Sequence, residues 1–447
     1  MNKNYSLKEF SSAALKEKYY LYHHPSGLDI FIFPKKMTSS YAFFGTRFGS
    51  VDNTFKTEKN GEFITVPDGI AHFLEHKLFA NEDGSDSFER FSEYGADANA
   101  YTSFNRTTYY FGCTENFEES LTELLTFVTS PYFTEESIAK EIGIIEEEIK
   151  MYEDNPADRC YYGMLEGLYE KHSVRRNICG SSESIRRITP SLLYDCYRVF
   201  YSLSNMVLAV CTDISPEKII EIADKVLPRE AKKTEIIRSN ENVYEKKEAA
   251  SAYTERRMNV SKPWFYIGIK DTDIPDTPEG IIKKDVLMMI LNDMLFSECT
   301  DFYNRLLDSE IIYPNLRYGY TICDSFAYNS ISGVADEPKL VLERLLSYIE
   351  ALKESGLDRE DFIRAKRVMY AEFVKLFDST EGIANQLFSY ACDGTDIFMN
   401  HELISSVTFE EIEELFKRAF SKEYITLSAV LPLEASQNQG GFYGRTT

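Results

Sequence analysis

The chain has 447 residues, of which 49 are Lys or Arg and 72 are Asp or Glu, so its formal net charge is −23. Hydrophobic residues make up 43% and aromatic residues 14% of the chain, which excludes a mainly disordered protein because such proteins lack the apolar residues of a core. The negative charge disfavours binding to nucleic acids and to anionic membrane surfaces, and it favours solubility or attraction of basic peptides.

The N-terminal residues 1–20 lack the apolar core of a signal peptide. No segment approaches the roughly 20 apolar residues of a membrane-spanning helix, so we expect no membrane insertion. The eight cysteines are scattered without a CxxC pair, which argues against a zinc ribbon or a disulfide framework and favours reduced thiols. These features predict a cytoplasmic protein.

The first half of the chain alternates predicted strands and helices. Residues 20–35 predict a β-hairpin with its turn at Ser26-Gly27, because apolar residues alternate after the turn. Residues 69–80 predict a helix with Asp68 as its N-cap. Further strands are predicted at 41–48, 99–112 and 205–211, and further helices at 116–129, 135–152, 159–171 and 190–200.

A similar series of elements follows a polar stretch. Strands are predicted at 264–271 and 424–431, a hairpin at 317–335, and helices at 281–308, 338–354, 358–377 and 408–420. The repetition predicts an α+β protein with two structurally similar domains, each a mainly antiparallel sheet covered by helices. We expect a first domain at 1–227, a linker at 228–258, a second domain at 259–435 and a flexible tail at 436–447.

The motif His72-Phe73-Leu74-Glu75-His76 is the sharpest local signal in the chain. Histidines four residues apart lie on one side of a helix, where their ring nitrogens can bind one tetrahedral zinc ion. Glu75 lies on nearly the same side, and a carboxylate there can take a proton from the hydrolytic water. The alternative is an ordinary pair of helix histidines, but buried imidazoles without a metal would need other polar partners.

A catalytic zinc site needs a third protein ligand. The predicted helix at 135–152 supplies carboxylates on both sides of a core stripe of isoleucines. Glu141 and Glu148 lie on one flank of the stripe, Glu146 lies on the other flank, and Glu147 points away from the core. This geometry does not separate Glu148 from Glu146, and a run of glutamates is also typical of a solvated acidic face.

These residues resemble the zinc peptidases of the pitrilysin/insulinase family, which carry the inverted HxxEH motif. The similarity covers most of the chain through SGLDIFIFP, GIAHFLEHKLF, GADANAYTSFNRTTYY, AKEIGIIEEEIKMYEDNP and FYSLSNMVLAV. The chain resembles the bacterial and mitochondrial-processing-peptidase-like members of comparable length. The resemblance implies the LuxS/MPP-like metallohydrolase fold, with two like-folded domains, and pairs of chains that enclose a chamber for unfolded peptides.

The resemblance also assigns roles to individual residues. It makes His72 and His76 zinc ligands, with one zinc ion per chain, and Glu75 the general base. It selects Glu148 as the third ligand and makes Glu141 a supporting carboxylate that orients a ligand or a water molecule.

The family's edge strand, which holds an extended peptide through main-chain hydrogen bonds, matches a second group of residues. These expected substrate-binding residues are Asn99, Ala100, Tyr101 and Thr102. Without the resemblance, Asn99 would be read as a turn residue at the start of a strand.

The chain departs from the family at one segment. Active members use an Arg and a Tyr seven residues apart, from the C-terminal domain, to bind substrate and stabilise the transition state. Leu307 and Pro314 occupy the matching positions here, and the nearby Arg305, Tyr313 and Arg317 do not have the required spacing. We therefore expect a related partner chain to supply the pair in a heterodimer. A homodimer and a shifted local alignment are the alternatives.

The expected function is that of a zinc metalloendopeptidase acting on peptides or unfolded segments, in which Glu75 activates the hydrolytic water and passes its proton to the leaving amine. The alternative is a non-catalytic structural or peptide-binding subunit of a heterodimer. The four residues His72, Glu75, His76 and Glu148 favour the enzyme, whereas the unmatched Arg/Tyr pair favours the subunit. A nucleotide-dependent enzyme is not indicated, because the sequence contains no Gly-rich phosphate loop.

Overall fold

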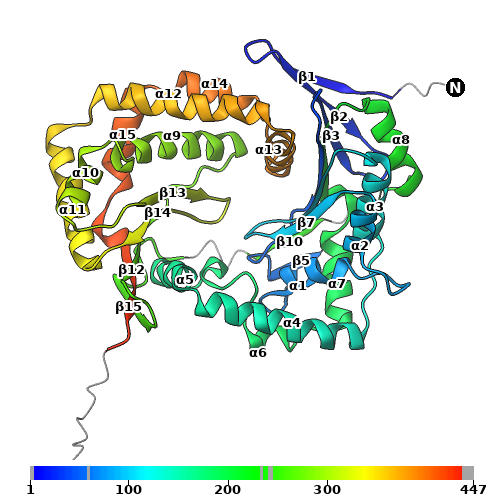
Figure 1. Cartoon of the computed structure of the whole chain (residues 1–447), viewed down its shortest axis with the longest axis horizontal. Coiled ribbons are helices and arrows are strands. Elements are labelled where there is room, and N and C mark those ends of the chain that lie inside the picture. The colour runs from blue at the N-terminus through cyan, green and yellow to red at the C-terminus, as the bar shows by residue number, and fades with distance from the viewer. Residues whose placement is uncertain (1–4, 58–60, 232–234, 240–244, 435–447) are drawn as a thin grey trace, which may run out of the picture.

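The computed structural model of the chain describes residues 5–57, 61–231, 235–239 and 245–434. It contains two α+β domains, each built on a mostly antiparallel sheet with helices (Figure 1), which confirms the predicted fold class. The expected tail at 436–447 lies outside the described residues.

The first domain contains a seven-stranded sheet of order β1-β2-β3-β9-β4-β8-β7, in which only β3 and β9 are parallel. Its strands are β1 (Lys8–Ser12), β2 (Glu17–His23), β3 (Asp29–Pro34), β4 (Ser40–Thr46), β7 (Asp97–Thr102), β8 (Thr107–Cys113) and β9 (Met206–Thr212). A small sheet joins β5 (Thr54–Thr57), β6 (Ile64–Thr65) and β10 (Ile236–Arg238). The helices of this part of the chain are α1 (Ile70–Leu78), α2 (Ser87–Glu93), α3 (Phe117–Thr129), α4 (Glu135–Asp154), α5 (Pro156–Leu168), α6 (Ser182–Ile185), α7 (Pro190–Phe200) and α8 (Pro216–Val226).

The second domain contains a five-stranded sheet of order β11-β15-β12-β14-β13. Its strands are β11 (Tyr253–Met258), β12 (Trp264–Asp271), β13 (Arg317–Ile322), β14 (Ala327–Val334) and β15 (Ile425–Pro432). Its helices are α9 (Pro278–Phe296), α10 (Asp301–Asp308), α11 (Pro338–Ser355), α12 (Arg359–Lys375), α13 (Thr380–Cys392), α14 (Met399–Ser406) and α15 (Phe409–Ala419).

The two sheets repeat one strand order. The series β3-β9-β4-β8-β7 corresponds to β11-β15-β12-β14-β13, and the first pair of each series is the parallel one. Within the predicted linker, β10 pairs with β5 of the first domain and β11 pairs with β15 of the second. We therefore propose that the chain passes from one domain to the other between β10 and β11.

Three sequence-based predictions were wrong in detail. Residues 99–112 form two strands, β7 and β8, joined by a turn closed by Ser103 N–H donating to the Arg106 carbonyl at 2.8 Å. Residues 281–308 form two helices, because the chain turns at 297–300 and Thr300 caps α10. The N-cap of α1 is Gly69 rather than Asp68, since the Asp68 carboxylate accepts hydrogen bonds from Asn53 and Arg176 instead.

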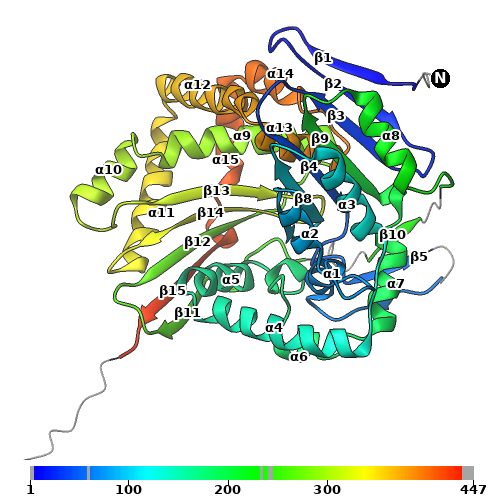
Figure 2. The same cartoon turned by 45° about the vertical axis from the view of Figure 1, so that its right-hand side comes forward.

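Each domain contributes one helix to the sheet of the other domain. Helix α5 follows the first-domain helix α4 and packs on β12, β15 and β11, whereas α13 follows the second-domain helix α12 and packs on β9, β4 and β3. Figures 1 and 2 show α5 beside the second sheet, and Figure 1 shows α13 beside the first. The two domains therefore share their cores, and one buried apolar cluster contains strand residues of both sheets.

Glycines allow these helices to approach the strands closely. A Cβ atom at Gly45 of β4 would lie 2.7 Å from Phe388 of α13, and one at Gly268 of β12 would lie 2.5 Å from Met164 of α5. On α5 itself, a Cβ at Gly167 would lie 2.3 Å from the Thr426 hydroxyl. These distances are too short for a side chain, so the contact between helix and sheet depends on glycine.

A buried pair of amides joins α9 to β14. Asn292 and Asn329 are 0% and 2% exposed, and each donates a hydrogen bond to the other at 2.7 Å. We expect Asn292→Ala to lower the free energy of unfolding by about 1–3 kcal/mol, because it leaves the Asn329 amide buried without this partner. Urea unfolding measures the effect. A double Asn292→Ala/Asn329→Ala variant should lose less than the sum of the single losses, and strict additivity would contradict this explanation.

Candidate metal and catalytic site

Helices α1 and α4 bring the predicted site residues together. Helix α1 starts at a left-handed N-cap, Gly69 with φ +89°, and buries an apolar face that includes Phe73 and Leu74 at 0% exposure. Helix α4 contacts α1 and packs through Ile145 and Ile149. The polar side of α1 therefore faces the flank of α4 that carries Glu141 and Glu148.

Both histidines of the motif face the carboxylate of Glu148. The Nε2 atom of His72 lies 3.6 Å from one Glu148 oxygen, and the Nε2 atom of His76 lies 3.4 Å from the other. Ligand atoms on a tetrahedral zinc ion with bonds of about 2.0–2.1 Å are roughly 3.4 Å apart. Each of the two histidine–carboxylate distances is therefore close to the value expected for ligands of one zinc ion, and two imidazoles and a carboxylate are a donor set that zinc prefers.

The supporting carboxylate predicted at Glu141 contacts the second histidine. The Nδ1 atom of His76 lies 3.0 Å from Glu141 Oε1, and Lys77 Nζ lies 3.6 Å from the other oxygen. Burial raises the pKa of Glu141, but the contacts with His76 and Lys77 outweigh it, so the net pKa is lowered. An anionic Glu141 fixes the orientation of the His76 ring and leaves Nε2 free to face Glu148.

We expect Glu141→Gln to weaken zinc binding by about 10–100-fold, because partners of this kind orient the ligand and increase its basicity. Competition with a chelating dye measures the dissociation constant. Glu147→Gln is the matched control, since the Glu147 side chain is 74% exposed on the same helix and pairs only with Lys150 among the ion pairs of the described chain. An unchanged zinc affinity in Glu141→Gln would remove Glu141 from the site.

Glu75 lies between the histidines and the edge of the first sheet. It is 8% exposed, and its Oε2 accepts a hydrogen bond of 2.6 Å from the Thr102 hydroxyl. Burial raises the pKa of Glu75, opposed by the charge of His72 and by the Thr102 hydrogen bond. A buried carboxylate with a raised pKa that borders the two histidines is suited to accept and return a proton.

The structure separates the two carboxylates that the sequence left as alternatives. Glu148 faces both histidines, whereas Glu146 forms an ion pair of 2.6 Å with Arg186 at the start of the segment after α6. The contact with His72 is the main cause of a lowered pKa of the Glu148 carboxyl group. Glu148, and not Glu146, therefore lies beside the two histidines, and its role as the third ligand stays a prediction.

The residues expected to bind substrate lie on β7, the last strand of the first sheet, which pairs with β8 alone in the described sheet. Thr102 contacts Glu75, and Tyr101 donates a hydrogen bond of 3.4 Å to Asn385 of α13. Asn99 accepts a hydrogen bond from the Ala100 N–H at 2.8 Å. The structure thus brings this strand beside the histidines, and its role in binding a peptide stays a prediction.

Two pockets adjoin Glu75 and His76. One of about 450 Å³ is lined by the motif, by Tyr152 and Tyr161, and by residues 177–179. The other, of about 470 Å³, is lined by Phe79, Phe88 and Ile144. Asn99 and Ala100 line both pockets, so an extended chain running along β7 would reach each of them.

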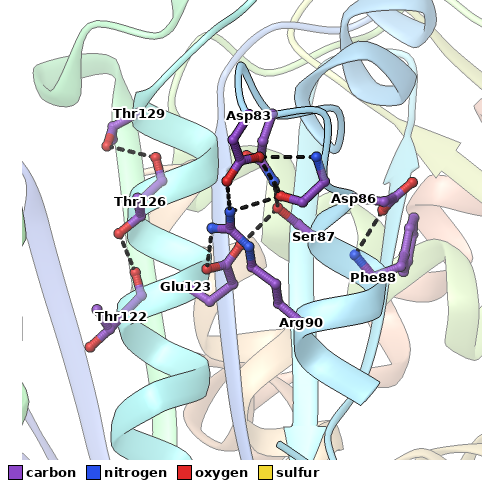
Figure 3. A network of polar contacts seen from close by, with 11 residues as sticks. Asp83, Asp86, Ser87, Phe88, Arg90, Thr122, Glu123, Thr126 and Thr129 are labelled. Carbon is purple, nitrogen blue, oxygen red and sulfur yellow. Dashed lines mark hydrogen bonds and ion pairs between the residues drawn. The ribbon is translucent and has the colours of Figure 1, made fainter. Parts of the chain in front are cut away.

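A polar network supports the rim of the second pocket (Figure 3). The carboxylate of Glu123 on α3, 6% exposed, accepts a hydrogen bond from Ser87 at 2.8 Å and pairs with Arg90 at 3.3 Å. Arg90 also pairs with Asp83 at 2.7 Å. These contacts fix α2, and with it Phe88, which stacks on Phe79 at a ring separation of 4.0 Å.

Cys179 was not singled out in the sequence, and the structure places it at the site. Its Sγ lies 3.8 Å from His72 Nε2, and ligand atoms of His72, Glu148 and Cys179 all lie within 4.8 Å of one another. Burial raises the pKa of the thiol. Only contacts between distant segments reveal this cysteine, because 107 residues separate it from His72.

The segment that matches the family's Arg/Tyr positions, where Leu307 and Pro314 stand, lies in the second domain, with Leu307 on α10. Arg305 pairs with Asp301 at 3.2 Å, and its side chain is 81% exposed. Tyr313 contacts Asp336. Among the pocket-lining residues of the described chain, neither Leu307 nor Pro314 borders the two histidines.

Comparison with known proteins identifies relatives of this chain. Residues 66–182 match the family described as "Insulinase (Peptidase family M16)", and residues 187–369 match "Peptidase M16 inactive domain". The chain is 36% identical over 432 residues to an uncharacterized zinc protease, YmfH, of Bacillus subtilis, covering 95% of this chain and 99% of that protein. The chain belongs to the M16 peptidase family.

Other M16 relatives share the fold or part of the sequence. The crystal structure of an M16-like peptidase from Alicyclobacillus acidocaldarius superposes with a TM-score of 0.87 at 30% identity, over 97% of this chain and 100% of that chain. The beta subunit of mitochondrial-processing peptidase from Bos taurus is 27% identical over 173 residues, 38% of this chain and 34% of that protein. Within the described part of this M16 chain, no helix is long and apolar enough to cross a membrane.

Proposed function

We propose that this chain is a zinc metalloendopeptidase that hydrolyses peptides or unfolded segments. The observation that carries the proposal is the convergence of His72, His76 and Glu148 at distances of 3.4–3.6 Å, with the buried carboxylate of Glu75 beside them. When bound there, zinc would act as a Lewis acid toward the scissile carbonyl and the attacking water.

The side chains of this M16 protein supply the remaining functions. Glu75 accepts the proton of the attacking water and returns it to the leaving amine. Thr102 holds the carboxylate of Glu75 in place through its hydroxyl. Strand β7 binds the substrate backbone as an added strand, and the two pockets at its side receive substrate side chains.

We infer that a related chain completes the site. The support is the position of the segment around Leu307, which lies in the second domain away from both pockets, and the relative named as a beta subunit of a processing peptidase. Such a partner supplies cationic or hydroxyl groups that stabilise the oxyanion. A cytoplasmic location is supported by eight cysteines that are all free thiols.

Metal analysis and a cleavage assay test the proposal together. We expect about one zinc ion per chain, and hydrolysis of an internally quenched peptide that is lost with a chelator and restored by added zinc. The assay uses the chain alone and the complex purified from the source cell. A chain that holds no zinc, or a zinc-loaded complex that cleaves no peptide, would instead support a non-catalytic subunit.

A further inference from the structure

The loop that contains Cys179 is held firmly against the start of the metal-site helix. A Cβ at Gly69 would lie 2.4 Å from the Cys179 carbonyl oxygen, and a Cβ at Gly180 would lie 2.4 Å from the Asp68 carbonyl oxygen. Both glycines have positive φ, +89° and +76°. The two backbones therefore touch, and they fix the thiol of Cys179, which is 4% exposed, over the first turn of α1.

The Cys179 thiol contacts His72, whose two ring nitrogens have few other polar neighbours among the described residues. His72 is 7% exposed, and its Nδ1 has no hydrogen-bond partner among the described residues. Its Nε2 faces two groups, a Glu148 oxygen at 3.6 Å and the Cys179 sulfur at 3.8 Å. On a tetrahedral zinc ion with Zn–N of about 2.0–2.1 Å and Zn–S of about 2.3 Å, nitrogen and sulfur are roughly 3.6 Å apart.

We propose that Cys179 is a fourth protein ligand of the metal, bound as a thiolate. This inference rests on the proposed zinc site and goes beyond it. As the sulfur–metal bond forms, the S–H bond breaks and its proton passes to solvent. Four protein ligands, His72, His76, Glu148 and Cys179, would close the coordination of the zinc ion, whereas catalytic sites leave one position open. A thiolate bound there takes the position that water occupies in a catalytic zinc site.

Cobalt replacement tests the proposal without an activity assay. We expect the full-length chain with one bound Co²⁺ to show a near-ultraviolet thiolate-to-cobalt charge-transfer band. The band should be lost in Cys179→Ser and retained in Cys299→Ser, a control for adventitious binding because Cys299 is the exposed cysteine of the described chain. A stoichiometric cobalt protein without the band, or a band that persists in Cys179→Ser, overturns the proposal and leaves the zinc peptidase intact.

A second measurement needs no variant and covers the case in which Cys179→Ser does not fold. Zinc-edge X-ray absorption of the wild-type chain should show one sulfur at about 2.3 Å among nitrogen and oxygen ligands at about 2.0–2.1 Å. A shell of nitrogen and oxygen alone overturns the proposal for Cys179. A chain that binds neither zinc nor cobalt overturns the proposed function itself, which distinguishes the two failures.

Discussion

Glu75→Gln should abolish peptide hydrolysis and leave the metal bound. Glutamine keeps the shape of the side chain and can still accept the hydrogen bond from Thr102, but it cannot take a proton from water. General acid–base catalysis contributes about 10²–10⁴-fold to a rate, so kcat should fall by about 10²-fold or more. The rate is measured with an internally quenched peptide, and zinc is quantified in the same sample.

Glu147→Gln is the matched control for this variant, because it makes the same chemical change on an exposed side chain of α4. It should retain full activity and about one zinc ion per chain. If the chain is active only with its partner, both variants are compared in that complex. Full activity in Glu75→Gln would remove Glu75 from the mechanism, and loss of zinc would show that the residue acts on the metal site instead.

Phe388→Ala should destabilise the whole chain rather than one domain. Phe388 belongs to α13 of the second domain, is 0% exposed, and packs on the first sheet beside Phe43 at a ring separation of 6.3 Å. Removing a buried Phe side chain costs about 3–5 kcal/mol through lost burial and the cavity left behind. Urea unfolding followed by circular dichroism should therefore show a free energy of unfolding lower by that amount.

The exposed Phe63 provides the control for this change. Its side chain is 47% exposed and lies under Lys56 on the small sheet, so Phe63→Ala should alter stability by less than about 1 kcal/mol. The carbonyls at the end of α13 accept hydrogen bonds from Arg47 of the first domain at 2.7 and 2.9 Å. A Phe388→Ala variant in which the two domains unfold in separate steps, with the first unaffected, would contradict the shared core.

The relative placement of the three motif residues was predictable because it is local. The spacing of His72, Glu75 and His76 places them on one side of any helix, and the structure has that helix. The third carboxylate was harder, because periodicity within α4 put Glu146 and Glu148 on two flanks of one stripe. Only the packing of α4 against α1 shows which flank faces the histidines.

Two predicted elements were too long because residues that favour a strand or a helix lie on both sides of a turn. Residues 99–112 are rich in strand-forming side chains, so the turn at 103–106 was not recognised. Helices α2, α6, α8, α13 and α14 were not predicted. Helix α13 covers the first sheet. Its hydrogen bonds with Arg47 join residues more than 300 positions apart in the chain, so the local sequence does not reveal this contact.

By itself the sequence determined the two-domain α+β class, the order of most strands and helices, and the residues of α1 that lie together on one side of that helix, because these follow from alternation and from helical spacing. The tertiary structure alone decided three further features: the approach of Glu148 rather than Glu146 to the two histidines, the exchange of α5 and α13 between the sheets, and the approach of Cys179 to His72. Each depends on contacts between segments far apart in the chain, and such contacts are set by packing rather than by local propensity.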